Sequence, residues 1–116
     1  MTEQEIFDQV AKHLLVQNRR AIEDFSCRYR TAKGLKCSVG FLINDDEYEV
    51  FMENNDVLAL RNCGLLPDRL IPHIGFLLSL QDVHDYNPPR KWRGALFLVA
   101  KKHQLKTDVL EEKYNG

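Results

Sequence analysis

The sequence predicts a single α+β domain, residues 1–116, that is mainly helical and carries a small β-hairpin packed on the helices. Apolar residues recur at helical spacing in three long stretches, whereas a stretch in the first half of the chain alternates between apolar and polar residues as strands do. The chain has 116 residues, of which 44% are hydrophobic, and this size and composition are typical of one globular domain.

The first predicted helix runs from about Glu3 to Asn18. Thr2 and Glu5 have the spacing of a capping box, in which each side chain accepts a hydrogen bond from the backbone N–H of the other residue. The apolar residues that follow at helical spacing are Ile6, Phe7, Val10, Ala11, Leu14 and Leu15.

A β-hairpin is predicted between Phe25 and Val39, where apolar residues recur at every second position. Lys33-Gly34 has the composition of a turn between its strands. Because two strands alone are marginally stable in water, the hairpin must pack against the helices. The residues expected on its buried face are Cys27, Tyr29, Cys37 and Val39.

Two short helices are predicted next. The first, from Asp45 to about Met52, follows a favourable N-cap at Asn44 and begins with acidic residues that suit the positive end of a helix. The second begins near Val57 and ends at Gly64, which is placed to stop it.

The stretch from Leu70 to Asp85 is apolar on nearly every side, as expected of a helix at the centre of the core. The segment Asn87-Pro88-Pro89 prevents its continuation. A last long helix is expected from Pro89 to about Gln104, and the segment 107–116 is expected to form one or two further polar turns and to end in a mobile tail.

Composition limits the classes of function. The chain has 16 Lys and Arg residues and 17 Asp and Glu residues, and a net charge of −1 does not attract nucleic acid or anionic lipid to the molecule as a whole. The longest apolar stretch, 70–80, is far shorter than the ~20 residues of a membrane-spanning helix. The acidic N-terminus does not suit a signal peptide. We therefore expect a cytoplasmic protein with no membrane partner.

Charge is distributed unevenly along the chain. Residues 45–56 contain six acids and no base, residues 90–106 contain six bases and no acid, and residues 19–36 contain a second group of bases. Such segments are usually solvated faces that attract one another across the fold, and the alternative is a docking surface. The candidate partner-binding residues are Arg28, Arg30, Asp45, Asp46, Glu47 and Glu49.

Candidate catalytic chemistry is found at His84 and Asp85. On a helix these two residues lie on the same side as Gln81, and a histidine beside a carboxylate is the minimum for acid–base catalysis or metal binding. The alternative is structural: a hydrogen bond from the His84 imidazole would hold the end of the central helix to the hairpin. Cys37 is a further catalytic candidate, as a nucleophilic thiol.

The cysteines predict neither a disulfide framework nor a metal site. Cys27, Cys37 and Cys63 match no zinc-binding spacing, and three is an odd number. Small thiols on a buried hairpin face usually serve as packing residues. We therefore expect reduced thiols, no metal and no cofactor.

Four segments share a pattern with other proteins. They read CRYR at 27–30, GLKCSVG at 34–40, LINDDEY at 42–48 and LQDVHD at 80–85. With the helix from Trp92 to His103, they resemble a group of short uncharacterised proteins of bacteriophages, prophages and bacteria. This chain has Phe41 where the group often has Cys, and Asn44 where it often has Pro. The resemblance implies a small accessory protein encoded by a phage or mobile element, and it assigns no catalytic residue.

The expected function is therefore that of a non-enzymatic accessory protein that binds a host protein, as a host-takeover factor or a counter-defence inhibitor. One alternative is a small hydrolase or metal-dependent enzyme centred on His84 and Asp85, and a pocket that joins His84 to a cysteine and a carboxylate would favour it. The other is a nucleic-acid-binding module that uses the basic segments 19–36 and 90–106. A contiguous Arg/Lys face would favour this second alternative.

Overall fold

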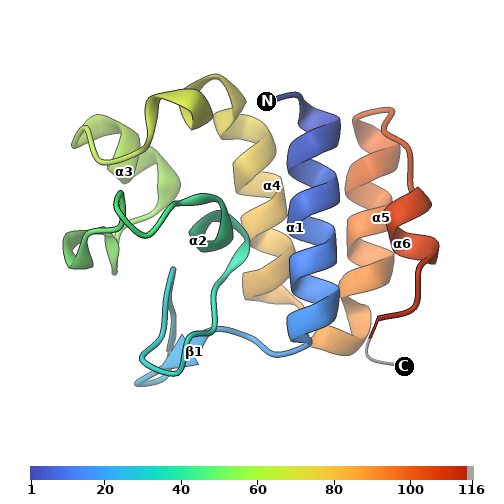
Figure 1. Ribbon diagram of the computed structural model, residues 1–116, viewed down its shortest axis with the longest axis horizontal. Helices are drawn as coiled ribbons and strands as arrows, with labels where there is room; N and C mark the ends of the chain where they lie inside the picture. Colours follow the sequence, from blue (N-terminus) through green and yellow to red (C-terminus); the bar gives the residue numbers. More distant parts are fainter. Residues whose placement is uncertain (115–116) are drawn as a thin grey trace.

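Three long helices form the frame of the molecule in the computed structural model, which describes residues 1–114. They are α1 (Glu3–Gln17), α4 (Ile74–Tyr86) and α5 (Trp92–Lys102), which pack against one another, with α1 between the other two in Figure 1. No helix within the described residues is long and apolar enough to cross a membrane.

The remaining elements are short and pack on this frame. α2 contacts both α1 and α4, and α6 contacts α1 and α5. The helices and strands among them are β1 (Ile22–Glu23), β2 (Ser26–Cys27), α2 (Ser38–Leu42), α3 (Val57–Asn62) and α6 (Asp108–Glu111). The 3-10 helices are η1 (Val50–Met52), η2 (Asp68–His73) and η3 (Pro89–Lys91).

The core confirms a mainly helical α+β fold with α4 near its centre. Phe7 of α1, Leu77 and Leu80 of α4, and Trp92 and Leu96 of α5 are all fully buried. The predicted central helix is divided in two: the chain forms the 3-10 helix η2 around Pro72, and the α-helix begins at Ile74.

The hairpin lies earlier in the chain than the sequence predicted. β1 and β2 pair antiparallel, with Ile22 opposite Cys27. They are joined by Asp24 and Phe25, which both have positive φ angles, 52° and 66°. The predicted turn at Gly34 is present, with φ +87°, but it closes an isolated β-bridge rather than a pair of strands.

The predicted second strand is wrong because the chain turns into α2 instead. The Cys37 Sγ accepts the backbone N–H of Gly40 at 3.3 Å and so caps the helix. The helix presses Gly40 against Tyr29, where a Cβ atom would lie 2.0 Å from the Tyr29 carbonyl oxygen, so that only glycine fits. Of the residues predicted to be buried here, Tyr29, Cys37 and Val39 are buried, and Cys27 is partly exposed.

The predicted helix over 45–52 is also wrong: a turn follows Asn44, and only the short η1 forms after it. A continuous helix would place Asp45, Glu49 and Glu53 on one face at a spacing of four, where like charges repel. Glu53 instead turns inward and is buried.

The other predicted helices are confirmed. α1 begins with the Thr2 capping box, α3 begins after an Asp56 N-cap, and α5 follows the two prolines. Beyond α5, the chain forms α6 with Leu110 buried. The last part of the tail that was predicted to be mobile, residues 115–116, lies outside the described residues.

Candidate functional site

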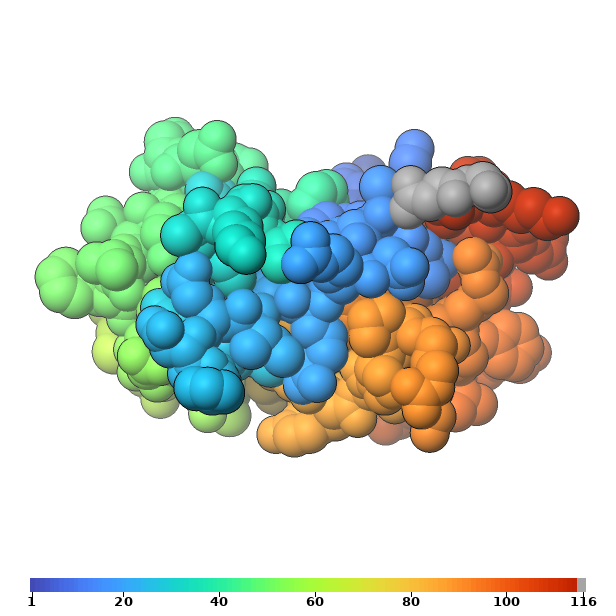
Figure 2. All heavy atoms as spheres, turned by 90° about the horizontal axis from the view of Figure 1, so that it is seen from below, coloured from blue at the N-terminus to red at the C-terminus, as the bar shows by residue number. Residues whose placement is uncertain are grey.

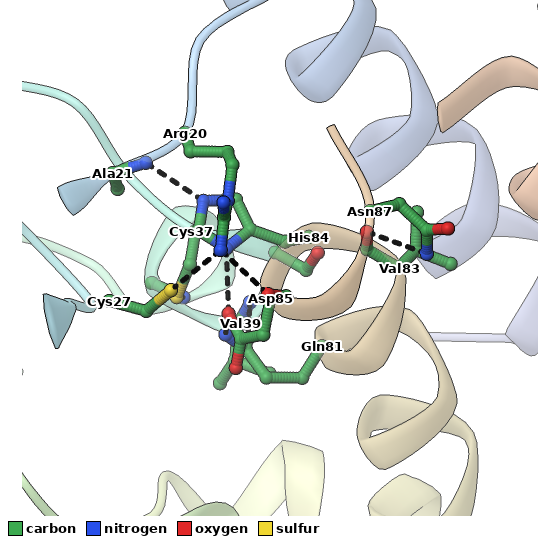
Figure 3. A network of polar contacts seen from close by, with 12 residues as sticks. Arg20, Ala21, Cys27, Cys37, Val39, Gln81, Val83, His84, Asp85 and Asn87 are labelled. Carbon is green, nitrogen blue, oxygen red and sulfur yellow. Dashed lines mark hydrogen bonds and ion pairs between the residues drawn. The ribbon is translucent and has the colours of Figure 1, made fainter. Parts of the chain in front are cut away.

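The segment that carries the hairpin is attached to the last turn of α4 through His84, as Figure 3 shows. His84 is fully buried, and its Nε2 accepts the backbone N–H of Ala21 at 2.9 Å. Its Nδ1 lies 2.7 Å from Asp85 Oδ1. Since Nε2 is an acceptor, the hydrogen-bond network places the proton on Nδ1, which donates to Asp85. The ring also stacks on Trp92, 5.6 Å away between centroids, so this contact is part of the core.

Asp85 is the centre of a wider polar network (Figure 3). The Arg20 Nη2 donates to the Asp85 carbonyl oxygen at 2.7 Å and lies 3.8 Å from the Cys27 Sγ. The Gln81 Nε2 donates to Asp85 Oδ1 at 3.0 Å, and its Oε1 accepts the backbone N–H of Val39 at 3.1 Å. The end of α4 is thus joined to the chain before β1, to β2 and to α2.

A cleft of about 350 Å³ opens beside this network. Its walls are β2 with the residues that follow it, the segment 53–57 and the C-terminal half of α4. Cys27, Asp85 and the exposed Tyr86 line it, whereas His84 lies behind the wall and has no access to solvent.

Cys27 and the predicted Cys37 both line this cleft, but only Cys27 lies close to His84 and Asp85. One ligand atom each of Cys27, His84 and Asp85 lie within 4.8 Å of one another, which is the convergence that an enzyme or metal site would need. Both ring nitrogens of His84 are already hydrogen-bonded, however, so neither is available to take a proton from the thiol. The Arg20 guanidinium beside the Sγ also opposes a bound metal cation.

Both thiols of this region favour the protonated form. Burial is the main cause that raises the pKa of Cys27, and the nearby Asp85 carboxylate raises it further. Burial raises the pKa of Cys37 to about 12. Because the thiolate is the reactive species, these environments suit packing rather than nucleophilic attack.

Four of the six charged residues predicted to bind a partner form ion pairs within the chain. They pair as Arg30 with Asp45, Glu47 with Arg69, and Arg28 with Glu23 and Asp24. Asp46 and Glu49 are exposed and have no ion pair with any described residue. The six bases of 90–106 are also exposed and, within residues 1–114, form no ion pair. Among the described residues, the exposed bases of α5 and its flanks are therefore not neutralised by ion pairs.

Sequence reasoning missed the tip of the hairpin. Asp24 and Phe25 form a two-residue turn with positive φ at both positions, as in type I′ turns, where Asn and Gly are usual. This left-handed backbone costs about 1–2 kcal/mol for a residue such as phenylalanine. The Phe25 side chain is nevertheless fully exposed. The tip is thus both strained and apolar, and an Asp-Phe pair gives no turn signal in the sequence.

Sequence reasoning also missed Glu53. Its buried carboxylate accepts the backbone N–H groups of Tyr29 and Arg30, at 2.9 and 3.1 Å, and the hydroxyl of Tyr48 at 2.7 Å. It holds the chain after β2 against the segment 48–53. A single glutamate before a polar run carries no sequence signal for this role.

Comparisons with known proteins find no match. No family model matches the sequence, and neither the curated proteins nor the solved structures contain a significant one. The resemblance to phage proteins therefore stays an expectation, and the function has to be argued from the geometry.

Proposed function

We propose that this chain is a non-enzymatic binding protein that contacts a partner protein through the tip of the β1–β2 hairpin. Phe25 carries the proposal, since it is fully exposed and has a strained, left-handed backbone. Glycine at this position would remove the backbone strain, and a polar side chain would be better solvated. Neither the strained backbone nor the exposed ring of Phe25 therefore stabilises the fold. A protruding aromatic side chain is typical of an anchor that fills a pocket on a partner.

The attachment of the hairpin supports this proposal. The hydrogen bonds of Ala21 with His84 and of Arg20 with Asp85 hold one end of the hairpin on α4. The Arg28 Nη2 lies 3.4 Å from Asp24 and stiffens the turn from the side. A hairpin that is already ordered loses less conformational entropy when it binds, which favours affinity.

The partner that we propose is a bacterial host protein in the cytoplasm, and the proposed effect is inhibition. This setting rests on the resemblance to phage and prophage proteins. The polar contacts described for His84 and Asp85 support a structural role for both residues and leave the binding surface as the functional part of the molecule.

A photo-crosslinking experiment tests the proposal. The chain would carry p-benzoylphenylalanine at position 25, or at position 33 as a matched control in the neighbouring exposed turn, and would be irradiated in a bacterial lysate. We expect a discrete adduct from position 25 that excess wild-type chain suppresses and excess Phe25→Gly chain does not. Identical adduct patterns from the two positions, or no adduct from position 25, would contradict the proposal.

A further inference from the structure

The outward face of α5 combines exposed apolar side chains with bases. Leu98 is 69% exposed and Phe97 is 45% exposed, although both belong to a helix of the frame. The bases on this helix and just before it are Arg90, Lys91, Arg93, Lys101 and Lys102. An apolar centre with a charged rim is the usual anatomy of a protein interface.

A groove of about 420 Å³ runs between α4 and α5 on one side of this face. Two kinds of side chain in the lining determine what the groove can bind. The apolar ones are Val83 and Tyr86 from α4, and Ala95 and Leu98 from α5. The charged ones are Asp82 from α4 and Lys102 from α5.

The α5 wall of the groove has a regular order. Ala95, Leu98 and Lys102 line the groove. Lys91, the last residue of η3 and the N-cap of α5, lies outside the lining and precedes Ala95 by four residues, so it continues the same stripe toward the start of the helix. The two lysines are eleven residues apart, which corresponds to about 16 Å along a helix axis. An apolar stretch of about two turns is therefore bounded by a cation at each end.

We propose that this groove binds an amphipathic helix of a partner protein, with apolar side chains against Leu98 and Tyr86 and a carboxylate near each of the two lysines. The proposal rests on the proposed function as a protein-binding chain, but it uses a surface other than the hairpin tip. A partner helix with acids about three turns apart matches the stripe in both length and charge.

Asp82 distinguishes this partner from nucleic acid. Its exposed carboxylate lies on the opposite wall of the same groove, so a continuous row of phosphates would meet a negative charge at the centre. A protein helix avoids this repulsion by placing a neutral or basic residue opposite Asp82. Leu98 and Tyr86 also need an apolar counterpart, which a phosphate backbone does not supply.

The groove adjoins the cleft beside the hairpin. Asp82 and Tyr86 line both concavities and form the ridge between them. Figure 2 shows the segment 18–36, in blue to cyan, next to the end of α4 and the start of α5, in orange, on one face of the molecule. The cleft beside β2 and the groove therefore lie next to each other on the surface.

Selection from a display library of helix-forming peptides of about 18 residues tests the inference. We expect the peptides enriched on the wild-type chain to carry an apolar stripe with acids about three turns apart. Lys102→Glu and Leu98→Asp should each weaken binding of these peptides about tenfold, and Lys102→Gln about threefold. Lys101→Glu is the matched control, because the Lys101 ammonium lies over the Phe97 ring, and we expect less than about a twofold effect.

Several results would overturn the inference while leaving the hairpin proposal intact. They are enrichment of no peptide, enriched peptides without acids, or equal effects of Lys101→Glu and Lys102→Glu. Displacement of the peptides by a DNA duplex of about 20 base pairs would assign the face to nucleic acid instead. Circular dichroism of each variant checks that the helices remain, and all three substituted side chains are exposed in the folded chain.

Discussion

The three long helices and the segment 19–56 share one apolar core, but the segment depends in addition on single polar contacts. The helices contact one another through fully buried apolar side chains such as Phe7, Leu77 and Leu96. The segment 19–56 also buries apolar residues in this core, such as Val39, Ile43 and Met52, but its elements are short and single polar side chains fix much of its backbone. These contacts join Ala21 to His84, Val39 to Gln81, Lys36 to Gln17, and Tyr29 to Glu53. The difference teaches that stability comes mainly from the helices, whereas the shape of the proposed binding segment depends on a few individual residues.

The largest effect is expected in the helical frame. Leu77→Ala should lower the free energy of unfolding by about 2–5 kcal/mol, because it removes buried apolar surface and leaves a cavity. Leu98→Ala is the control on the exposed face and should change stability by less than about 0.5 kcal/mol. Urea denaturation measures both. Equal midpoints for the two variants would contradict the role of α4 as the centre of the core.

The next largest effect is expected within the segment 19–56, where α2 packs against the chain that follows β2. Gly40→Ala would place a Cβ 2.0 Å from the Tyr29 carbonyl oxygen, and the resulting backbone shift should cost about 1–3 kcal/mol. Gly94→Ala is the matched control in α5, where a Cβ meets nothing within 4 Å, and it should stabilise the chain by up to about 1 kcal/mol. A stable Gly40→Ala variant would show that the contact between α2 and the chain after β2 is dispensable.

His84 joins the two regions. His84→Ala leaves the buried N–H of Ala21 without its acceptor and should cost about 1–3 kcal/mol of stability. Hydrogen exchange at the Ala21 amide should accelerate more than exchange at the buried amides of α1. His103→Ala, which removes a partly exposed ring whose Nδ1 lies 3.5 Å from the Glu3 carboxylate, should cost less than about 1 kcal/mol. Full stability of His84→Ala together with lost partner binding would assign His84 to the binding site instead.

The contrast between the two regions also explains what the sequence could predict. Helical periodicity and caps such as Thr2 and Asp56 are local signals, and the long helices and α3 followed from them. The hairpin was misplaced because the helix at Ser38–Leu42 depends on the contact of Gly40 with Tyr29, which only the folded chain brings together. Local patterning cannot identify a tertiary contact of this kind.

In the candidate site, too, some features could be predicted from local sequence signals and others could not. The hydrogen bond of His84 was expected from its place at the end of an apolar helix, ahead of two prolines, and the bond to Ala21 is present. Cys27 was expected on a buried face, but it lines the cleft instead. The left-handed backbone of Phe25 and the buried carboxylate of Glu53 could not be predicted. Backbone strain and long-range hydrogen bonds produce no recognisable residue pattern in a sequence.

A dependence on pH is expected at His13, which joins α1 to the segment 19–56. Its ring stacks on Phe41, and its Nε2 donates to the Lys36 carbonyl oxygen at 2.8 Å. Burial lowers the pKa of His13 below its ordinary value of 6.5, despite the opposing effect of this hydrogen bond. The unfolded chain therefore binds the proton more readily, and the contribution of His13 to stability is present above pH 6.5 and is lost as the pH falls below that value.

Urea denaturation of wild type and His13→Gln at about pH 7.5 and about pH 5.5 measures this contribution. We expect the wild type to lose more stability on acidification than the variant, whose side-chain amide can still donate to Lys36 but does not titrate. Identical pH dependence of the two chains would contradict the assigned role of His13.

The smallest change in stability gives the most direct test of the central claim, which is that the hairpin holds Phe25 in a strained, exposed conformation for binding. Phe25→Gly should raise the free energy of unfolding by about 0.5–1 kcal/mol, because glycine tolerates a φ of 66°. The same variant should lose most of its affinity for the protein crosslinked from position 25. Urea denaturation and titration with that protein give the two values. We predict that stability rises while affinity falls, and a variant that loses stability or binds as tightly as the wild type would contradict the account.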